Sequence, residues 1–326
     1  MKKKIAILSV IFIVSFILDI ALGSVNFKTS QILEAFLGHG DDITRAIILD
    51  YRIPKALTAI LAGASLSVSG VLMQTLFRNP LAGPDVLGVT SGASLGVALL
   101  TLGAGFLPTF ILGNWGQVAA AIIGAAIVML LVIFVSMRVT HSATLLIVGL
   151  MFGYFTGAIV SILQSMANPN ILKLFITWTF GSLSAVGWNS IGIMATIIVI
   201  GLIGSLLLHK HLDTLILGDN YAVSLGTDVK KLRIIIIAIT ALLTGTCTAF
   251  TGPIAFIGIT IPHLTRLLLR SDIHRKILPV SILCGAIVML LCDVISQLPG
   301  GNITLPINSV TAIFGAPIII WIILKR

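Results

Sequence analysis

The side chains that could do chemistry are few in this sequence, and they lie near the ends of apolar runs. His141, His209 and His211 stand at such ends, and His263 lies beside Pro262. An interfacial histidine is ordinary in a membrane protein, and for His263 capping or packing outweighs metal binding by about four to one. Because no Ser-His-Asp or Cys-His grouping stands out, we predict neither a catalytic residue nor a metal site.

The acidic and sulfur-containing side chains also argue against chemistry inside a membrane. Ion-coupled transporters usually place an ionisable group at mid-membrane. The acidic residues of the apolar runs instead lie near the ends of those runs, at Asp19, Asp85 and Asp293. The three cysteines lack metal-ligand spacing, and no G-x-x-x-x-G-K-[ST] loop is present to hydrolyse ATP. An ion-coupled secondary transporter stays open as the alternative, since hydroxyls and backbone carbonyls can bind sodium.

Composition predicts an integral membrane protein. Of the 326 residues, 57% are hydrophobic and 10% are charged, whereas soluble domains carry about 25% charged residues. Apolar runs of about 20 residues recur, which predicts an all-α, polytopic protein in a lipid bilayer. The net charge of +9 does not imply nucleic acid, because the positions of Lys and Arg matter more than their sum here. We predict a single transmembrane domain over residues 1–326 and no nucleic-acid partner.

Ten membrane-spanning helices are predicted, and the first lacks a signal-peptide cleavage site. They cover residues 5–23, 54–77, 84–103, 117–137, 143–166, 188–208, 232–251, 252–269, 277–296 and 305–324. Ten spans put both termini on one side, which holds fifteen of the 20 Lys and Arg residues. That excess predicts that both termini are cytoplasmic. Spans two to five and seven to ten would form two four-helix units, inverted relative to each other.

The longest predicted cytoplasmic loop, residues 209–231, carries a short amphipathic helix between Gly218 and Gly226. Asp219 lies near its start, where an acidic side chain suits the helix dipole. Such a helix can lie on lipid headgroups, or it can dock in a groove of a partner protein. From the physical pattern alone, these two interpretations are about even.

Several separate motifs in a fixed order carry a family resemblance. Residues 52–96 join a run rich in Gly, Ala and Ser to a polar turn at 78–80 and a second Gly-rich run. Further motifs are LGDNYAVSLG at 217–226, WTFGSL at 178–183, GPIAFIGITIPHLTRLL at 252–268, SDIHRKILP at 271–279 and LPINSVTAIFGAPIIIWIILKR at 305–326. The sequence resembles the FecCD-type permease subunits of ABC importers for iron–siderophore complexes, haem and cobalamin.

The resemblance implies partners and a location. Two permease copies, a homodimer, would form the path, two ATPase subunits would bind beneath it, and an extracytoplasmic binding protein would deliver the ligand. The chain would bind no cofactor itself, because ATP and Mg²⁺ belong to the partner ATPase. It would lie in the bacterial cytoplasmic (inner) membrane. Its cargo would be an iron–siderophore complex or haem in the first place and cobalamin in the second.

The resemblance also assigns roles to three groups of residues. ATPase coupling falls to Leu217, Gly218, Asp219, Ala222, Leu225 and Gly226. A cytoplasmic gate falls to His141, Ser142, Ala143 and Thr144, whose hydroxyls also suit helix capping. Docking of the binding protein falls to Arg52, Lys55 and Gln297. The two cations could instead anchor the span at the headgroups, and Gln297 stands where some relatives have a third basic residue.

Overall fold

The computed structural model describes residues 2–23, 27, 29–39, 41–103, 113–139, 142–298 and 304–324, and these residues form helices and no strand. The α-helices are α1 (Lys2–Ala21), α2 (Thr29–Phe36), α3 (Asp42–Arg45), α4 (Ile53–Phe77), α5 (Val89–Thr101), α6 (Asn114–Arg138), α7 (Ser142–Met166), α8 (Pro169–Thr179), α9 (Trp188–Leu207), α10 (His209–Ile216), α11 (Asp219–Ser224), α12 (Val229–Thr251), α13 (Ile257–Leu269), α14 (His274–Gln297) and α15 (Ile307–Leu324). The π-helix η1 (Ala46–Arg52) leads into α4, and short 3₁₀ turns occur at η2 (Pro84–Leu87) and η5 (Leu183–Ala185).

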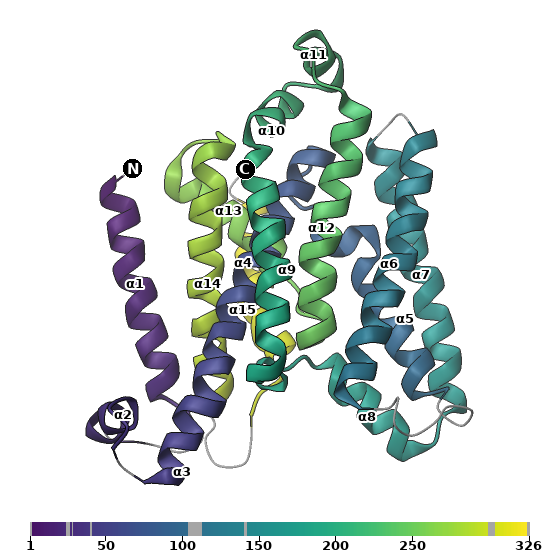
Figure 1. Cartoon of the computed structure of the whole chain (residues 1–326). Coiled ribbons are helices and arrows are strands. Elements are labelled where there is room, and N and C mark those ends of the chain that lie inside the picture. The colour runs from purple at the N-terminus through teal and green to yellow at the C-terminus, as the bar shows by residue number, and fades with distance from the viewer. Residues whose placement is uncertain are drawn as a thin grey trace.

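Ten apolar helices correspond to the ten predicted spans. In the part of the chain that the structure describes, seven helical segments are long and apolar enough to cross a membrane. They contain α1, α4, α6, α7, α9, α12 and α14, and shorter apolar helices occur at α5, α13 and α15. The long helices run along roughly one direction (Figure 1). The predicted all-α, multi-span class is therefore confirmed.

Two predicted spans are shorter in the structure than the sequence suggests. Residues 84–103 were expected to form one span, but η2 and a left-handed Gly88 precede α5. Residues 252–269 were expected to form another, but Gly252 and Phe256 have φ of 73° and 69°, so α13 begins only at Ile257. Helices α5 and α13 have 13 residues each. That is a rise of about 20 Å, whereas a bilayer core is about 30 Å thick.

The lengths and directions of the helices agree with two related four-helix units. In each unit the second helix has 13 residues, α5 in the first and α13 in the second. Helix α4 ends near α11. Arg78, just past its end, contacts the backbone of Leu215, which lies in α10 shortly before α11. Helix α12 instead starts just after α11 and runs away from it (Figure 1). The first helices of the two units therefore run in opposite directions.

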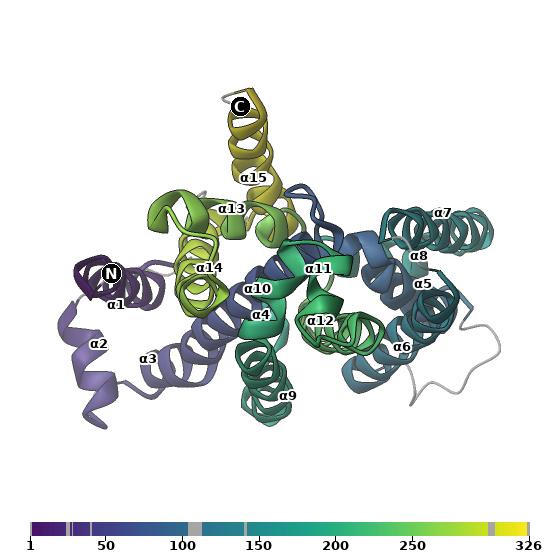
Figure 2. The same cartoon turned by 90° about the horizontal axis from the view of Figure 1, so that it is seen from above.

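Helix α4 is the centre of the fold, and it packs against α9, α12, α13 and α14 (Figure 2). Small residues make this packing possible. A Cβ atom on Gly63 would overlap the backbone carbonyl of Gly285 in α14, and one on Gly70 would overlap the carbonyl of Gly258 in α13. The Gly-, Ala- and Ser-rich run therefore does what its composition predicts, since it lets two neighbouring backbones approach closely.

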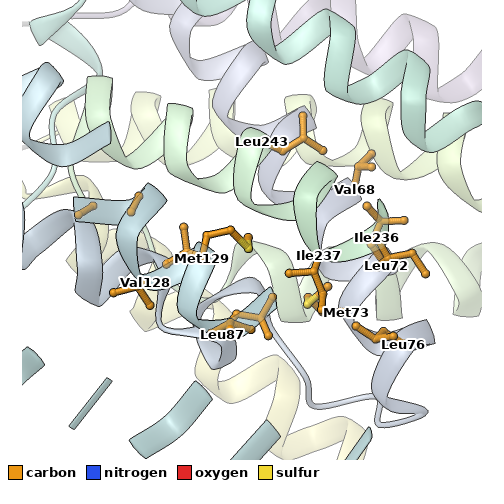
Figure 3. Packing of buried hydrophobic residues seen from close by; sticks show 14 of the residues in the cluster. Val68, Leu72, Met73, Leu76, Leu87, Val128, Met129, Ile236, Ile237 and Leu243 are labelled. Atoms are coloured by element: carbon orange, nitrogen blue, oxygen red, sulfur yellow. The ribbon is translucent and has the colours of Figure 1, made fainter. Parts of the chain in front are cut away.

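The apolar core lies where α12 packs against α4 on one side and α6 on the other. Figure 3 shows buried side chains of the three helices and of η2 gathered in one cluster. Its labelled members are Val68, Leu72, Met73, Leu76, Leu87, Val128, Met129, Ile236, Ile237 and Leu243. This cluster fixes the ends of α4 and α12, from which two arginines reach toward α11.

Candidate functional site

Helices α10 and α11 form a platform that projects beyond one end of the helix bundle (Figure 1). We call residues 209–226 the α10–α11 platform. Gly218 and Gly226 flank α11 with φ of 117° and 79°. Residues other than glycine rarely adopt such angles, so the two glycines set the bends on either side of α11. The sequence predicts this short helix, but it does not predict α10 as a second helix before it.

Asp219 ties the platform to the bundle through two arginines. Arg78, just past the end of α4, forms an ion pair with Asp219, and its Nε donates a hydrogen bond to the carbonyl of Leu215 at 3.1 Å. Arg233 in α12 lies 3.6 Å from the other carboxylate oxygen and donates to the carbonyl of Val139 at 2.9 Å. One carboxylate thus connects α11 to the ends of α4 and α12.

A second polar contact holds α10. The Asp213 carboxylate accepts a hydrogen bond from the backbone N–H of His274 at 2.9 Å and lies 2.7 Å from its ring Nδ1. The other ring nitrogen lies 2.8 Å from Thr75 Oγ1, near the end of α4. The His274 side chain is fully buried. The platform is therefore joined to α4, α12 and α14, which are three helices of the central bundle.

The platform has one packed face and one exposed apolar face. Leu212, Leu215 and Ala222 point into the molecule and are buried. More than half of the residue is exposed at Leu217, Tyr221, Val223 and Leu225, and Ile216 is 39% exposed. Exposed apolar side chains on a rigidly held helix suit docking into a groove of another protein.

The predicted gate residues lie at the start of α7. His141 lies outside the described residues, whereas Ser142 is the first residue of α7 and Ala143 and Thr144 are exposed. Further along, α7 exposes large apolar side chains, at Met151, Tyr154, Phe155 and Met166. Such a helix face suits contact with lipid or with a second polypeptide.

The predicted docking residues meet at the opposite end of the bundle, and their contacts are internal. Lys55 Nζ lies 2.7 Å from Asp293 Oδ2, and the Gln297 amide donates to the same carboxylate at 3.1 Å. Arg52 donates hydrogen bonds to the carbonyls of Ile20 and Ala21 at 2.6 and 3.0 Å. Arg52 and Lys55 are only 6% and 8% exposed. The structure thus brings the three residues together but packs both cations inside the chain.

The residues that the sequence interpretation missed are the partners of the predicted ones. Asp293 near the end of an apolar run was a signal, because a carboxylate there needs a compensating cation. Arg78 was visible only as part of a polar turn, and no pattern connects it to Asp219, 141 positions away. Asp213 and His274 carry no local signal of their contact. Among the described residues, His, Cys, Asp and Glu form no cluster of three or more suited to a metal ion.

Comparisons with known proteins agree on one family. The FecCD transport family matches residues 11–325. The hemin transport system permease protein HmuU of Yersinia pestis is 33% identical over 319 residues, covering 97% of this chain and 95% of that protein. The vitamin B12 import system permease protein BtuC of Vibrio cholerae is 36% identical over 288 residues, covering 87% of this chain and 84% of that protein. A solved metal-chelate type ABC transporter in an inward-facing conformation has a TM-score of 0.89 and 28% identity, with 100% of both chains covered.

Proposed function

Because the chain belongs to the FecCD transport family, we propose that it moves a metal chelate into a bacterial cell across the cytoplasmic membrane. It is the membrane-spanning permease subunit of an ABC importer. Its relatives are named for hemin and vitamin B12, and its structural neighbour is a metal-chelate type transporter. All three describe a metal held in an organic chelate. We rank an iron–siderophore complex or haem first as the cargo and cobalamin second.

The observation that carries the proposal of ATP-driven import is the α10–α11 platform. Leu217, Gly218, Asp219, Ala222, Leu225 and Gly226 form the proposed ATPase-coupling element, whose exposed apolar face enters a groove of the ATPase. Two ATPase subunits bind ATP and Mg²⁺, one beneath each permease copy. Because Asp219 is held by Arg78 and Arg233, a displacement of the docked ATPase is passed to α4 and α12 rather than absorbed by a loose loop.

The platform lies in the cytoplasm in the proposed orientation. Fifteen of the 20 Lys and Arg residues fall in segments assigned to that side, as expected for cytoplasmic loops. Helix α1 begins and α15 ends toward the end of the molecule that carries the platform (Figure 1). Both termini are therefore assigned to the cytoplasm.

The translocation path is formed by two copies of the chain in this proposal. The start of α7, with His141, Ser142, Ala143 and Thr144, closes the path on the cytoplasmic side. The binding protein docks on the opposite end, around Arg52, Lys55 and Gln297. Because both cations have internal partners, we expect them to shape this docking surface as well as attract acidic side chains.

Reconstitution tests the proposal against an ion-coupled transporter. The chain is placed in liposomes with its ATPase and binding protein, and uptake of haem, an iron–siderophore complex and cobalamin is measured. We expect uptake of one of these chelates to require ATP, Mg²⁺ and the ATPase. Uptake driven by a proton or sodium gradient without the ATPase would contradict the proposal.

A further inference from the structure

A cavity lined by aromatic side chains opens at the end of the bundle opposite the α10–α11 platform. Its volume is about 490 Å³, and residues of η1, α6, α8, α9 and α12 line it. Its aromatic residues are Trp115, Trp178, Trp188 and Phe250, so it holds three of the four tryptophans in the chain. Tryptophan is enriched where the bilayer core meets the headgroups. The cavity therefore lies at the depth of lipid headgroups, not at mid-membrane.

The polar groups of this cavity suit a headgroup that carries both a cation and an anion. Asp50 is the one charged residue that lines it, and within the described ranges no salt bridge to Asp50 is found. Asp50 is exposed and shares this cavity with three tryptophans, and a carboxylate and the faces of aromatic rings both attract a cationic nitrogen. Helices α6 and α9 both begin at the cavity, at Asn114 and Trp188. The backbone N–H groups of a first helical turn favour an anion such as phosphate. In α9 one of them, that of Ser190, already donates to the carbonyl of Gly187 at 3.0 Å, which leaves those of Trp188 and Asn189 for the anion.

A second cavity continues along the same helices toward the middle of the membrane. Its volume is about 380 Å³, and it is lined mainly by apolar residues of α6 and α12, with one from α9. On α6 the first cavity ends at Val118 and the second begins at Ile122, a rise of about 6 Å. On α12 the corresponding residues are Ala249 and Thr246, about 5 Å apart. Helices α9, α12 and α6 lie side by side along one edge of the molecule (Figure 2).

We propose that these two cavities bind one phospholipid with a zwitterionic headgroup, in the leaflet opposite the platform. The headgroup nitrogen lies at Asp50 among the tryptophan rings, the phosphate lies at the starts of α6 and α9, and an acyl chain follows the apolar cavity. A soluble ligand would not need the apolar continuation. An anionic lipid would meet Asp50 without a compensating charge. This inference is additional to the transport role and rests on the chain being a membrane protein.

Native mass spectrometry of the full chain in mild detergent tests the proposal. Equal amounts of dioleoylphosphatidylethanolamine, dioleoylphosphatidylcholine and dioleoylphosphatidylglycerol are added, and retained lipids are counted. We expect one retained zwitterionic lipid in preference to phosphatidylglycerol. Asp50→Asn should lower this preference roughly fivefold, which corresponds to the interaction free energy of an exposed charge pair. Asp50→Glu should keep the preference. Asp42→Asn is the matched control, since Asp42 is an exposed acid of α3 that lines neither cavity.

The apolar cavity is tested with a bulky substitution. Ala126→Phe fills the wall contributed by α6 and should reduce retention of the zwitterionic lipids. Ala6→Phe, at an exposed position of α1, should not change it. Equal retention of phosphatidylglycerol by the wild type would overturn the proposal, as would no retained lipid at all. Identical results for Asp50→Asn and Asp42→Asn, or for Ala126→Phe and Ala6→Phe, would also overturn it.

Discussion

Asp219 is one of two acidic residues that join the platform to the rest of the molecule, the other being Asp213. Its carboxylate pairs with Arg78 and lies near Arg233, and these arginines come from α4 and α12. The Arg78 side chain is 40% exposed, so its pair with Asp219 adds only modestly to stability. The pair matters for position rather than for stability, because two contacts at the first residue of α11 join the platform to both α4 and α12, so that it moves with the bundle.

Loss of the Arg78 side chain should therefore weaken coupling more than folding. For Arg78→Gln we expect a roughly two- to fivefold lower rate of ATP-driven transport, in keeping with a partly exposed pair. The melting temperature should change little. Arg275→Gln, at an exposed position in the first turn of α14, is the matched control. The role assigned to Arg78 is wrong if both variants transport at the same rate.

Lys55 and Asp293 form a buried pair whose members depend on each other. Their side chains are 10% and 3% exposed and lie 2.7 Å apart. Lys55→Met leaves Asp293 buried without its cation, which should cost about 3 kcal/mol of stability. Thermal unfolding in detergent measures the loss, and adding Asp293→Asn should restore most of it. Lys173→Met, at an exposed lysine of α8, serves as the control. A Lys55→Met protein as stable as this control would contradict the buried pair.

At the scale of single residues, the sequence predicted where a charged residue lies along its helix better than it predicted the residue with which it forms an ion pair. It placed Asp219 at the start of a short helix and Asp293 near the end of a long one. It could not show that Arg78 reaches Asp219 or that Lys55 reaches Asp293, because these contacts join helices far apart in the chain. For the same reason Lys55 was interpreted as a charge facing outward, whereas its partner lies inside.

Among the elements, α4 and α14 depend on a contact between two glycines. A Cβ on Gly63 would overlap the carbonyl of Gly285, so Gly63→Ala must push the two helices apart. We expect a loss of about 1–3 kcal/mol, as for an overpacked core. Gly157→Ala in α7 is the control, since no atom lies within 4 Å of the added Cβ. The two variants are compared by thermal unfolding, and equal stability would argue against close packing of α4 and α14.

At the scale of elements, periodic apolar runs predicted the spans but not their interruptions. All ten expected spans have a helix in the structure. The sequence could not predict that α5 and α13 would be short, because Leu87 and Phe256 are as apolar as the residues that follow them. The interruption depends on backbone angles at Gly88, Gly252 and Phe256. Helix α10 was missed, although Leu212, Leu215 and Ile216 are spaced three and four residues apart, as on one face of a helix.

For the whole molecule, the proposed gate requires two copies of α7 to approach each other. Ser142→Cys in a chain without its native cysteines should form a disulfide between two copies in some nucleotide states and not in others. Oxidation followed by electrophoresis without reductant measures this. Met166→Cys, at an exposed position at the other end of α7, is the control. Cross-linking of Ser142→Cys that is independent of nucleotide, or absent throughout, would leave Ser142 with a capping role alone.

The central claim is that the α10–α11 platform is where the ATPase docks, and cross-linking tests it most directly. A photoreactive reagent is attached to Leu225→Cys, which is 56% exposed on the platform, in a chain without its native cysteines. Ile176→Cys, 37% exposed on α8 at the opposite end, is the control. We predict that the Leu225 position captures the ATPase subunit and that the Ile176 position does not. If the Leu225 position never captures the ATPase, or if both positions capture it equally, the account of the platform is contradicted.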